Sequence, residues 1–233
     1  MPATHHQVTR LEGFSDAVFG FGLTLLVVSL EVPSDLDALV NQMEGFLGFA
    51  LMFAMVCWIW YEHNWFFRRT GLQDPWTVFL NCVLLFVILF YVYPMKFLTA
   101  ALMSQFFGLG APGGPSLRSA GSGTTLMVLY STGVILIFSV FVLLYRHARN
   151  RRHELELSPD DELALACGMR GHLISLSLGV VSVGLALAAE GLAPVAGFIY
   201  ALMGPLHAWN GHRAGKARAA LAESAPALDR TGN

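Results

Sequence analysis

The stretch Arg10-Leu-Glu-Gly-Phe-Ser-Asp16 runs directly into a charge-free apolar segment, residues 17–30. Small residues recur three or four positions apart along this region: Gly13, Ala17, Gly20 and Thr24. Bulky apolar residues lie beside that row at helical spacing: Phe14, Phe21, Leu25 and Val28. Because residues three and four apart share one face of a helix, the pattern predicts a helix that packs closely against other helices.

The composition is typical of an integral membrane protein. Of the 233 residues, 55% are hydrophobic and only 13% are charged, and the mean hydropathy is +0.57. Soluble domains average about 25% charged residues. The N-terminus lacks the layout of a cleavable signal peptide, so we expect the first helix to stay in the mature protein. The three cysteines form no Cys-x-x-Cys pair, and we expect them to be small apolar packing residues.

Charge-free runs predict an all-α protein with six membrane spans, since most of them reach the ~17–25 residues that cross the hydrocarbon core. The expected spans are 13–32, 43–66, 75–98, 123–146, 165–189 and 191–212. The whole chain, 1–233, is expected to form one six-helix unit. Residues 105–125 would form a flexible external loop, and 213–233 a cytoplasmic tail. The first span is long enough only if it includes Asp16, a carboxylate that needs a partner at the membrane edge.

The positions of lysine and arginine predict that both termini are cytoplasmic. With six spans, all 14 Lys and Arg residues except Lys96 and Arg118 fall on the side of the N-terminus, and cytoplasmic loops carry such an excess. The expected localisation is therefore the cell membrane, as a multi-pass protein. On the same side, Ser158 followed by acidic residues predicts an N-cap that starts the fifth helix early.

The sequence does not favour an enzyme. No Ser/His/Asp or Cys/His set has a recognisable spacing, and no phosphate-binding glycine motif is present, so we expect no catalytic residues. His63, His172 and His207 lie near the ends of expected spans, where a histidine can bind haem or a metal but is more often hydrogen-bonded. We therefore expect no metal site and no cofactor.

The polar residues of the opening motif have candidate partners at the same membrane face. The second span runs inward and ends near His63. A network of Arg10, Asp16 and His63 would satisfy a carboxylate at the membrane edge. A simpler interpretation, compatible with the first, is that Ser15 and Asp16 cap a helix.

The motif Arg10-x-x-x-Phe14-Ser15-Asp16, followed by Val18-Phe19 and Thr24-Leu25-Leu26-Val27, resembles the first helix of the transmembrane protein 175 family. These are potassium-selective channels of endolysosomes and bacteria. The resemblance extends to Trp60-x-x-His63, to Pro94 in the third span and to the six-span length, and beyond roughly the first hundred residues it is only architectural. It implies a pore lined by the first helix and a structural polar network of Arg10, Ser15, Asp16, Trp60 and His63. Bacterial members carry one six-helix unit per chain and form tetramers, so the resemblance implies a prokaryotic homotetramer.

Carried over by position, the resemblance assigns the pore lining to Phe21 as the constriction, Thr24 as a hydroxyl ring and Val28 as the next apolar layer, with Leu25 beside them. Phe21, Thr24 and Val28 lie within about 60° on a helix of 3.6 residues per turn. The family usually has isoleucine or leucine where this chain has Phe21. A phenylalanine ring would tighten a dewetting gate, move the neck or weaken potassium selectivity. The alternative is that Phe21 packs against lipid or another helix.

We therefore predict a homotetrameric, potassium-permeable cation channel with a hydrophobic gate on the first helix and no carbonyl selectivity filter. Its expected partners are potassium ions, membrane lipid and further copies of the chain, and no nucleic acid. A secondary or proton-coupled transporter that uses Asp16 and His63 is the main alternative, although no inverted repeat supports it. A haem-binding redox protein that uses His63, His172 or His207 is the other.

Overall fold

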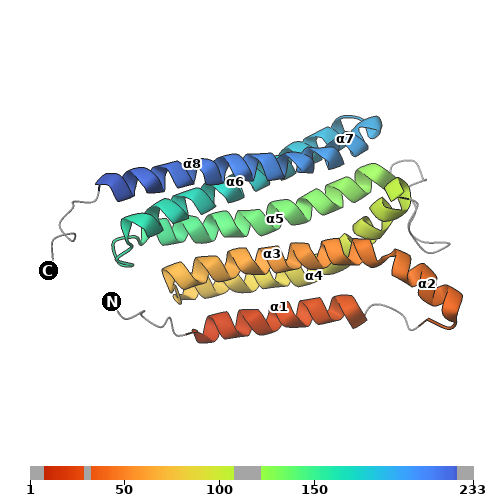
Figure 1. Cartoon of the computed structure of the whole chain (residues 1–233), viewed down its shortest axis with the longest axis horizontal. Coiled ribbons are helices and arrows are strands. Elements are labelled where there is room, and N and C mark those ends of the chain that lie inside the picture. Colours follow the sequence, from red (N-terminus) through yellow and green to blue (C-terminus); the bar gives the residue numbers. More distant parts are fainter. Residues whose placement is uncertain (1–7, 29–32, 108–121, 225–233) are drawn as a thin grey trace.

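The structure is a computed structural model that describes residues 8–28, 33–107 and 122–224. Within these ranges the chain folds into long helices that lie side by side, and passes that are consecutive in the sequence run in opposite directions (Figure 1). The α-helices are α1 (Arg10–Val28), α2 (Leu36–Glu44), α3 (Phe46–Thr70), α4 (Pro75–Phe107), α5 (Ser122–Asn150), α6 (Pro159–Ala188), α7 (Ala193–Phe198) and α8 (Met203–Ser224). Two short 3-10 helices, η1 (Glu190–Leu192) and η2 (Ile199–Leu202), flank α7.

Two helix ends show how the local sequence sets these bounds. The Ser158 side chain accepts a hydrogen bond from the Asp161 N–H at 3.1 Å, and Pro159 opens α6, so the predicted N-cap and the early start of this helix are confirmed. In the turn between α3 and α4, Gly71 ends α3, and its backbone lies in the left-handed region at φ 58°. Its N–H reaches the Phe67 carbonyl at 2.8 Å, a conformation that a residue without Cβ adopts at least cost.

Five of the described helices are long and apolar enough to cross a membrane. They are Arg10–Val28, Phe46–Thr70, Pro75–Ala101, Gly123–Asn150 and Pro159–Ala188. Each corresponds to one of the first five expected spans, with bounds that differ by a few residues. The expected loop 105–125 lies mostly outside the described residues, but α4 continues to Phe107 and α5 begins at Ser122.

The last expected span, 191–212, is not one continuous α-helix. The chain makes this pass as η1, α7, η2 and α8, and α8 then continues into the expected tail as far as Ser224. Pro205 explains the break before α8, since it has no N–H to bond to the carbonyl of residue 201, and η2 replaces the α-helical pattern there. Figure 1 places the start of α1 and the end of α8 at the same end of the bundle, called the termini end below.

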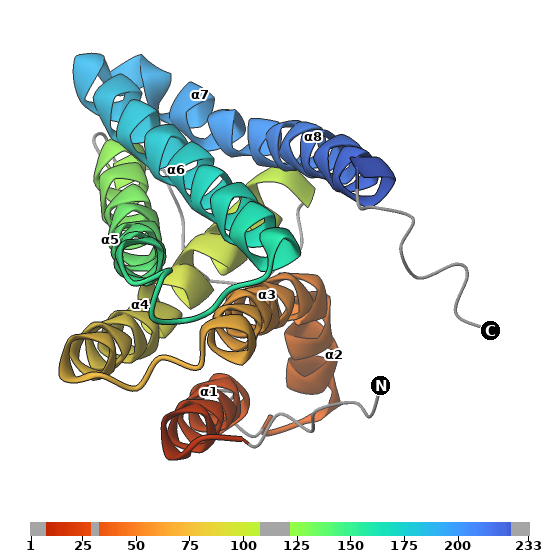
Figure 2. The same ribbon diagram turned by 90° about the vertical axis from the view of Figure 1, so that its left-hand side faces the viewer.

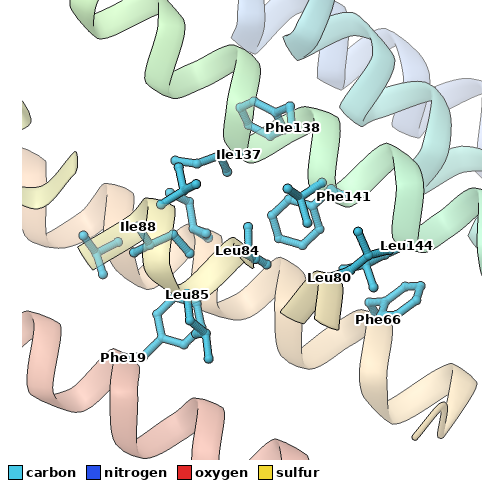
Figure 3. Packing of buried hydrophobic residues seen from close by; sticks show 14 of the residues in the cluster. Phe19, Phe66, Leu80, Leu84, Leu85, Ile88, Ile137, Phe138, Phe141 and Leu144 are labelled. Atoms are coloured by element: carbon cyan, nitrogen blue, oxygen red, sulfur yellow. The ribbon is translucent and has the colours of Figure 1, made fainter. Parts of the chain in front are cut away.

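The helices pack in a sequence that leaves α1 at one edge. α1 contacts α3 and α4; α4 contacts α5, α5 contacts α6, and α6 contacts α8. Figure 2, viewed from the termini end, shows α1 beneath α3 and α4 and far from α6 and α8. The core runs between these helices, and Figure 3 shows side chains from α1, α3, α4 and α5 meeting there, among them Phe19, Phe66, Leu84 and Phe141.

Asp74 joins the α3–α4 turn to the end of α5. Its carboxylate accepts hydrogen bonds from the Thr77 N–H and hydroxyl at 3.3 and 2.6 Å, as the N-cap of α4. His147 Nε2 lies 3.0 Å and Arg151 Nη1 3.3 Å from its Oδ2. Burial by itself disfavours the charged form, but the hydrogen bonds from Thr77 and His147 outweigh it and hold the pKa of the Asp74 carboxyl well below its usual value.

Asp74→Asn is expected to lower the free energy of unfolding at pH 7 by roughly 1–2 kcal/mol, the contribution of hydrogen bonds to a charged group. A carboxyl with a depressed folded pKa stabilises the fold above its unfolded pKa of about 3.9, and this contribution is lost as the pH falls through the lower folded pKa. The difference in the free energy of unfolding between the wild type and Asp74→Asn should therefore become smaller below about pH 4. Thermal unfolding of both proteins across the acid range measures it. Glu156→Gln, at an exposed position of the α5–α6 connection, is the control for the charge change.

Candidate functional site

Helix α1 has two opposite faces. Ser15, Phe19 and Leu26 are buried against α3 and α4. The predicted pore-lining residues are all exposed: Phe21, Thr24, Leu25 and Val28. Phe21 is 58% and Val28 70% exposed. At about 100° per residue, the centres of the two faces are roughly 150° apart. The exposed stripe therefore points away from the rest of its own chain.

Thr24 carries the polar group of the exposed stripe. Its hydroxyl donates a hydrogen bond to the Gly20 carbonyl of its own helix at 2.8 Å. Because this bond uses the hydroxyl proton, the oxygen keeps its lone pairs free to face outward. A hydroxyl held in this way is an acceptor, which is the property that a cation requires.

A buried polar chain ties α1 to its two neighbours. Asn81 of α4 donates its Nδ2–H to Ser15 Oγ of α1 at 2.9 Å. Its Oδ1 lies 2.7 Å from His63 Nε2 of α3. Ser15 in turn donates to the Leu11 carbonyl at 2.8 Å. Ser15 and Asn81 are fully buried, and Phe19 and Phe67 pack around the His63 ring. His63 Nδ1 has no hydrogen-bond partner in the described residues, but the bonds through Asn81 are buried, and buried polar contacts of this kind hold helices in one relative position.

The structure arranges the rest of the expected network differently. Asp16 Oδ1 accepts a hydrogen bond from Trp60 Nε1 of α3 at 2.7 Å, whereas His63 bonds to Asn81. In the described ranges, no hydrogen bond or ion pair links the exposed Arg10 to Asp16 or His63. The reason is rotation: Ser15 and Asp16 are about 100° apart on the helix, so Ser15 faces the interior while Asp16 lies at its rim.

The start of α1 corrects the capping interpretation of Ser15 and Asp16. Thr9 precedes the helix, and its hydroxyl accepts the Glu12 N–H at 3.2 Å, while the Thr9 N–H donates to Glu12 Oε2 at 2.8 Å. This reciprocal pair of hydrogen bonds is a capping box, and its sequence motif is Thr9-x-x-Glu12. Ser15 and Asp16 therefore lie within the helix, where they are free to contact other helices.

Asp16→Asn is expected to destabilise the attachment of α1 by about 1 kcal/mol, because it removes the charge from the hydrogen bond that Trp60 donates. For a chain of this size that corresponds to a melting temperature lower by about 2–4 °C. Trp60→Phe should have a similar effect, and the double variant should add little, since both remove one bond. Thermal unfolding measures this; fully additive effects would contradict the pairing.

The other expected histidines lie elsewhere. His172 of α6 is buried against the rings of Phe141 and Tyr145, and His207 of α8 bonds to Ser175 Oγ at 2.9 Å. Both border a cavity between α3, α6 and α8. Across the described part of the chain, no group of three or more His, Cys, Asp or Glu side chains is placed to hold a metal ion.

Comparison with known proteins matches residues 10–91, from the start of α1 into α4, to the family described as the endosomal/lysosomal potassium channel TMEM175. A protein of Marivirga tractuosa described as a potassium channel is 37% identical over 181 residues, which cover 76% of this chain and 73% of that one. The chain belongs to the TMEM175 family. The family is one of potassium channels and not of enzymes.

Solved structures of TMEM175 proteins share this fold. A variant of the potassium channel MtTMEM175, crystallised with a nanobody–MBP fusion protein, superposes with a TM-score of 0.78 at 33% identity. The match covers 93% of this chain and 98% of that one. A lysosomal potassium-selective channel TMEM175 homolog from Chamaesiphon minutus gives a TM-score of 0.58 at 21% identity, over 88% and 96% of the two chains, and supports the fold alone.

Proposed function

We propose that four copies of this chain form a potassium-permeable cation channel whose central pore is lined by α1 of each copy. The observation that supports this most is the exposed stripe of Phe21, Thr24, Leu25 and Val28, which lies opposite the buried face of α1. A relative and two structural neighbours are described as potassium channels. The proposed pore uses the one face of α1 that its own chain leaves uncovered.

The row of small residues beside this stripe fits close packing between copies. An added Cβ at Gly13 or Gly20 would meet nothing within 4 Å in the single chain. Small residues let membrane helices approach closely, so a second copy of α1 is the natural occupant of this space. The same surface facing lipid would need neither the small row nor a threonine.

In the proposed pore, Phe21 of each copy forms an apolar neck that conducts when it is wetted, and Val28 forms a second apolar layer. The outward lone pairs of Thr24 replace part of the hydration that a potassium ion loses there. The Ser15–Asn81–His63 chain and the Asp16–Trp60 bond then hold α1 against α3 and α4 without entering the ion path.

The proposed topology has six spans and both termini in the cytoplasm of a prokaryotic cell. The termini end of the bundle carries most of the Lys and Arg residues, as cytoplasmic ends do. The segmented pass from η1 to α8 serves as the last span. Its breaks are tolerated because α6 packs along it.

Purified protein reconstituted into planar bilayers tests the proposal. Reversal potentials with potassium on one side and sodium on the other should show potassium permeation, and the mass of the solubilised complex should be that of a tetramer. A chain that forms tetramers but passes neither cation would contradict the channel proposal.

The proton-coupled transporter requires proton exchange between Asp16 and His63. These side chains have separate partners, Trp60 and Asn81, so the geometry offers no direct relay between them. A transporter would give saturating flux that needs a pH gradient, whereas a channel conducts without one. The same bilayers distinguish the two.

A further inference from the structure

A cavity of about 300 Å³ lies between α3, α6 and α8, near the termini end and away from α1. Small residues on two helices line it: Gly168 and Gly171 of α6, and Gly211, Ala214 and Gly215 of α8. The walls are aromatic and polar, with Tyr61, Glu62 and Trp65 of α3 on one side. The proposed pore has no part in this space.

Glu62 brings a carboxylate to the cavity and has a side-chain hydrogen bond with Trp58 of its own helix. It lies within the membrane-spanning length of α3, and its only ion-pair neighbour in the described residues is His172, whose Nε2 is 3.8 Å from Oε2. Arg218 also lines the cavity, but its Nε lies 2.7 Å from Asp160, and Arg69 Nη1 lies 2.6 Å from Asp161. In the described residues the carboxylate has no Lys or Arg within ion-pair distance, so a bound cation would compensate its charge.

His172 lies beside Glu62 but does not neutralise it. The residue is 2% exposed, and neither of its ring nitrogens has a hydrogen-bond partner in the described part of the chain. The distance of 3.8 Å from its Nε2 to Glu62 is too long for a hydrogen bond. His172 therefore forms part of the cavity wall and leaves the Glu62 carboxylate available to a bound group.

We propose that this cavity binds a small organic ammonium ion. Glu62 would accept hydrogen bonds from the ammonium group, with His172 beside it. The short apolar part would lie against the glycine and alanine residues of α6 and α8, and the Tyr61 ring would line the side next to the charge. At about 300 Å³ the cavity is at the lower end of small-molecule sites and far larger than a bare potassium ion needs.

Calorimetric titration of the purified, full-length protein with n-butylammonium, 1-butanol and butyrate tests the proposal, at constant potassium chloride. Saturable binding of n-butylammonium alone is expected. Glu62→Gln should weaken it at least about tenfold, the effect of losing a hydrogen bond to a charged group. No binding of n-butylammonium to the wild type, or equal binding of 1-butanol, would overturn the proposal.

A steric variant keeps the test independent of the charge change. Gly211 borders the cavity, and an added Cβ there meets nothing within 4 Å, so Gly211→Leu fills space without a clash. Gly204 of the same helix is equally open but is not among the lining residues, which makes Gly204→Leu the matched control. Binding should disappear in Gly211→Leu and persist in Gly204→Leu. Binding that survives in Gly211→Leu would place the ammonium elsewhere, the pore included, and would contradict the inference.

Discussion

Phe21→Ala is expected to raise the potassium conductance of the reconstituted channel several-fold and to reduce its preference for potassium over sodium. Phe21 is the largest side chain of the proposed pore stripe, and it is 58% exposed in the single chain. In the proposed tetramer, a ring of four phenylalanines would exclude water from the neck, whereas four methyl groups would leave it open and wet. Because the side chain packs little on its own subunit, stability should change by less than about 1 kcal/mol.

Phe198→Ala is the matched control for this change. Phe198 is 63% exposed and lies on α7, a helix that Figure 2 shows far from α1. The same loss of an exposed aromatic ring there should leave conductance unaltered. Single-channel recordings in bilayers compare the variants directly. If Phe21→Ala conducts as the wild type does, Phe21 is a packing residue and the neck lies at another position of α1.

The elements of the fold follow from the sequence where one signal dominates. Long charge-free runs predict the five apolar helices, and Ser158 followed by acidic residues predicts the start of α6. The end of α4 is less predictable: the expected span stops at residue 98, soon after Lys96, although the helix continues to Phe107. A long lysine side chain can extend toward water without ending a helix.

Helix α2 was not among the expected elements, although its sequence carries a signal. Leu36, Leu39, Val40 and Met43 follow the spacing of an amphipathic helix. The segment is too short to cross a membrane, so hydropathy over the length of a span does not indicate it. The break in the last pass was missed for a similar reason: hydropathy does not predict that Pro205, which has no N–H, interrupts the hydrogen bonds of the helix.

The sequence predicts residues for the candidate site, and the structure differs from the expectation in how the polar ones are paired. Topology brings Ser15, Asp16, Trp60 and His63 to neighbouring turns, and spacing puts the pore stripe on one face. Which side chains bond depends on how each helix is rotated about its axis, and a charge pattern does not specify that. Asn81 is not among the residues expected in the polar network, yet this amide within the apolar residues of α4 links Ser15 to His63.

Asn81→Leu is accordingly expected to have the largest effect on stability. The two side chains are similar in size, so little cavity forms, but Ser15 and His63 each lose a buried partner. His63 is left with an unsatisfied nitrogen, at about 1–3 kcal/mol, whereas Ser15 keeps its bond to the Leu11 carbonyl and loses one hydrogen bond of about 1 kcal/mol, so the free energy of unfolding should fall by roughly 2–4 kcal/mol. That corresponds to a melting temperature lower by about 10 °C and to a lower tetramer yield, because α1 loosens from α3 and α4.

Thr132→Val provides the control, since its hydroxyl bonds only to the Val128 carbonyl of its own helix at 2.7 Å and its loss should cost little. Adding His63→Leu to Asn81→Leu should restore part of the stability, because removing both partners leaves fewer buried polar atoms unpaired than removing one. Thermal unfolding and size-exclusion profiles of the four proteins measure these effects. A double variant less stable than Asn81→Leu by the full cost of His63→Leu would mean that the two side chains act independently. In that case α1 would depend on the apolar contacts of Phe19 and Leu26, and the polar chain would not be what positions the proposed pore helix.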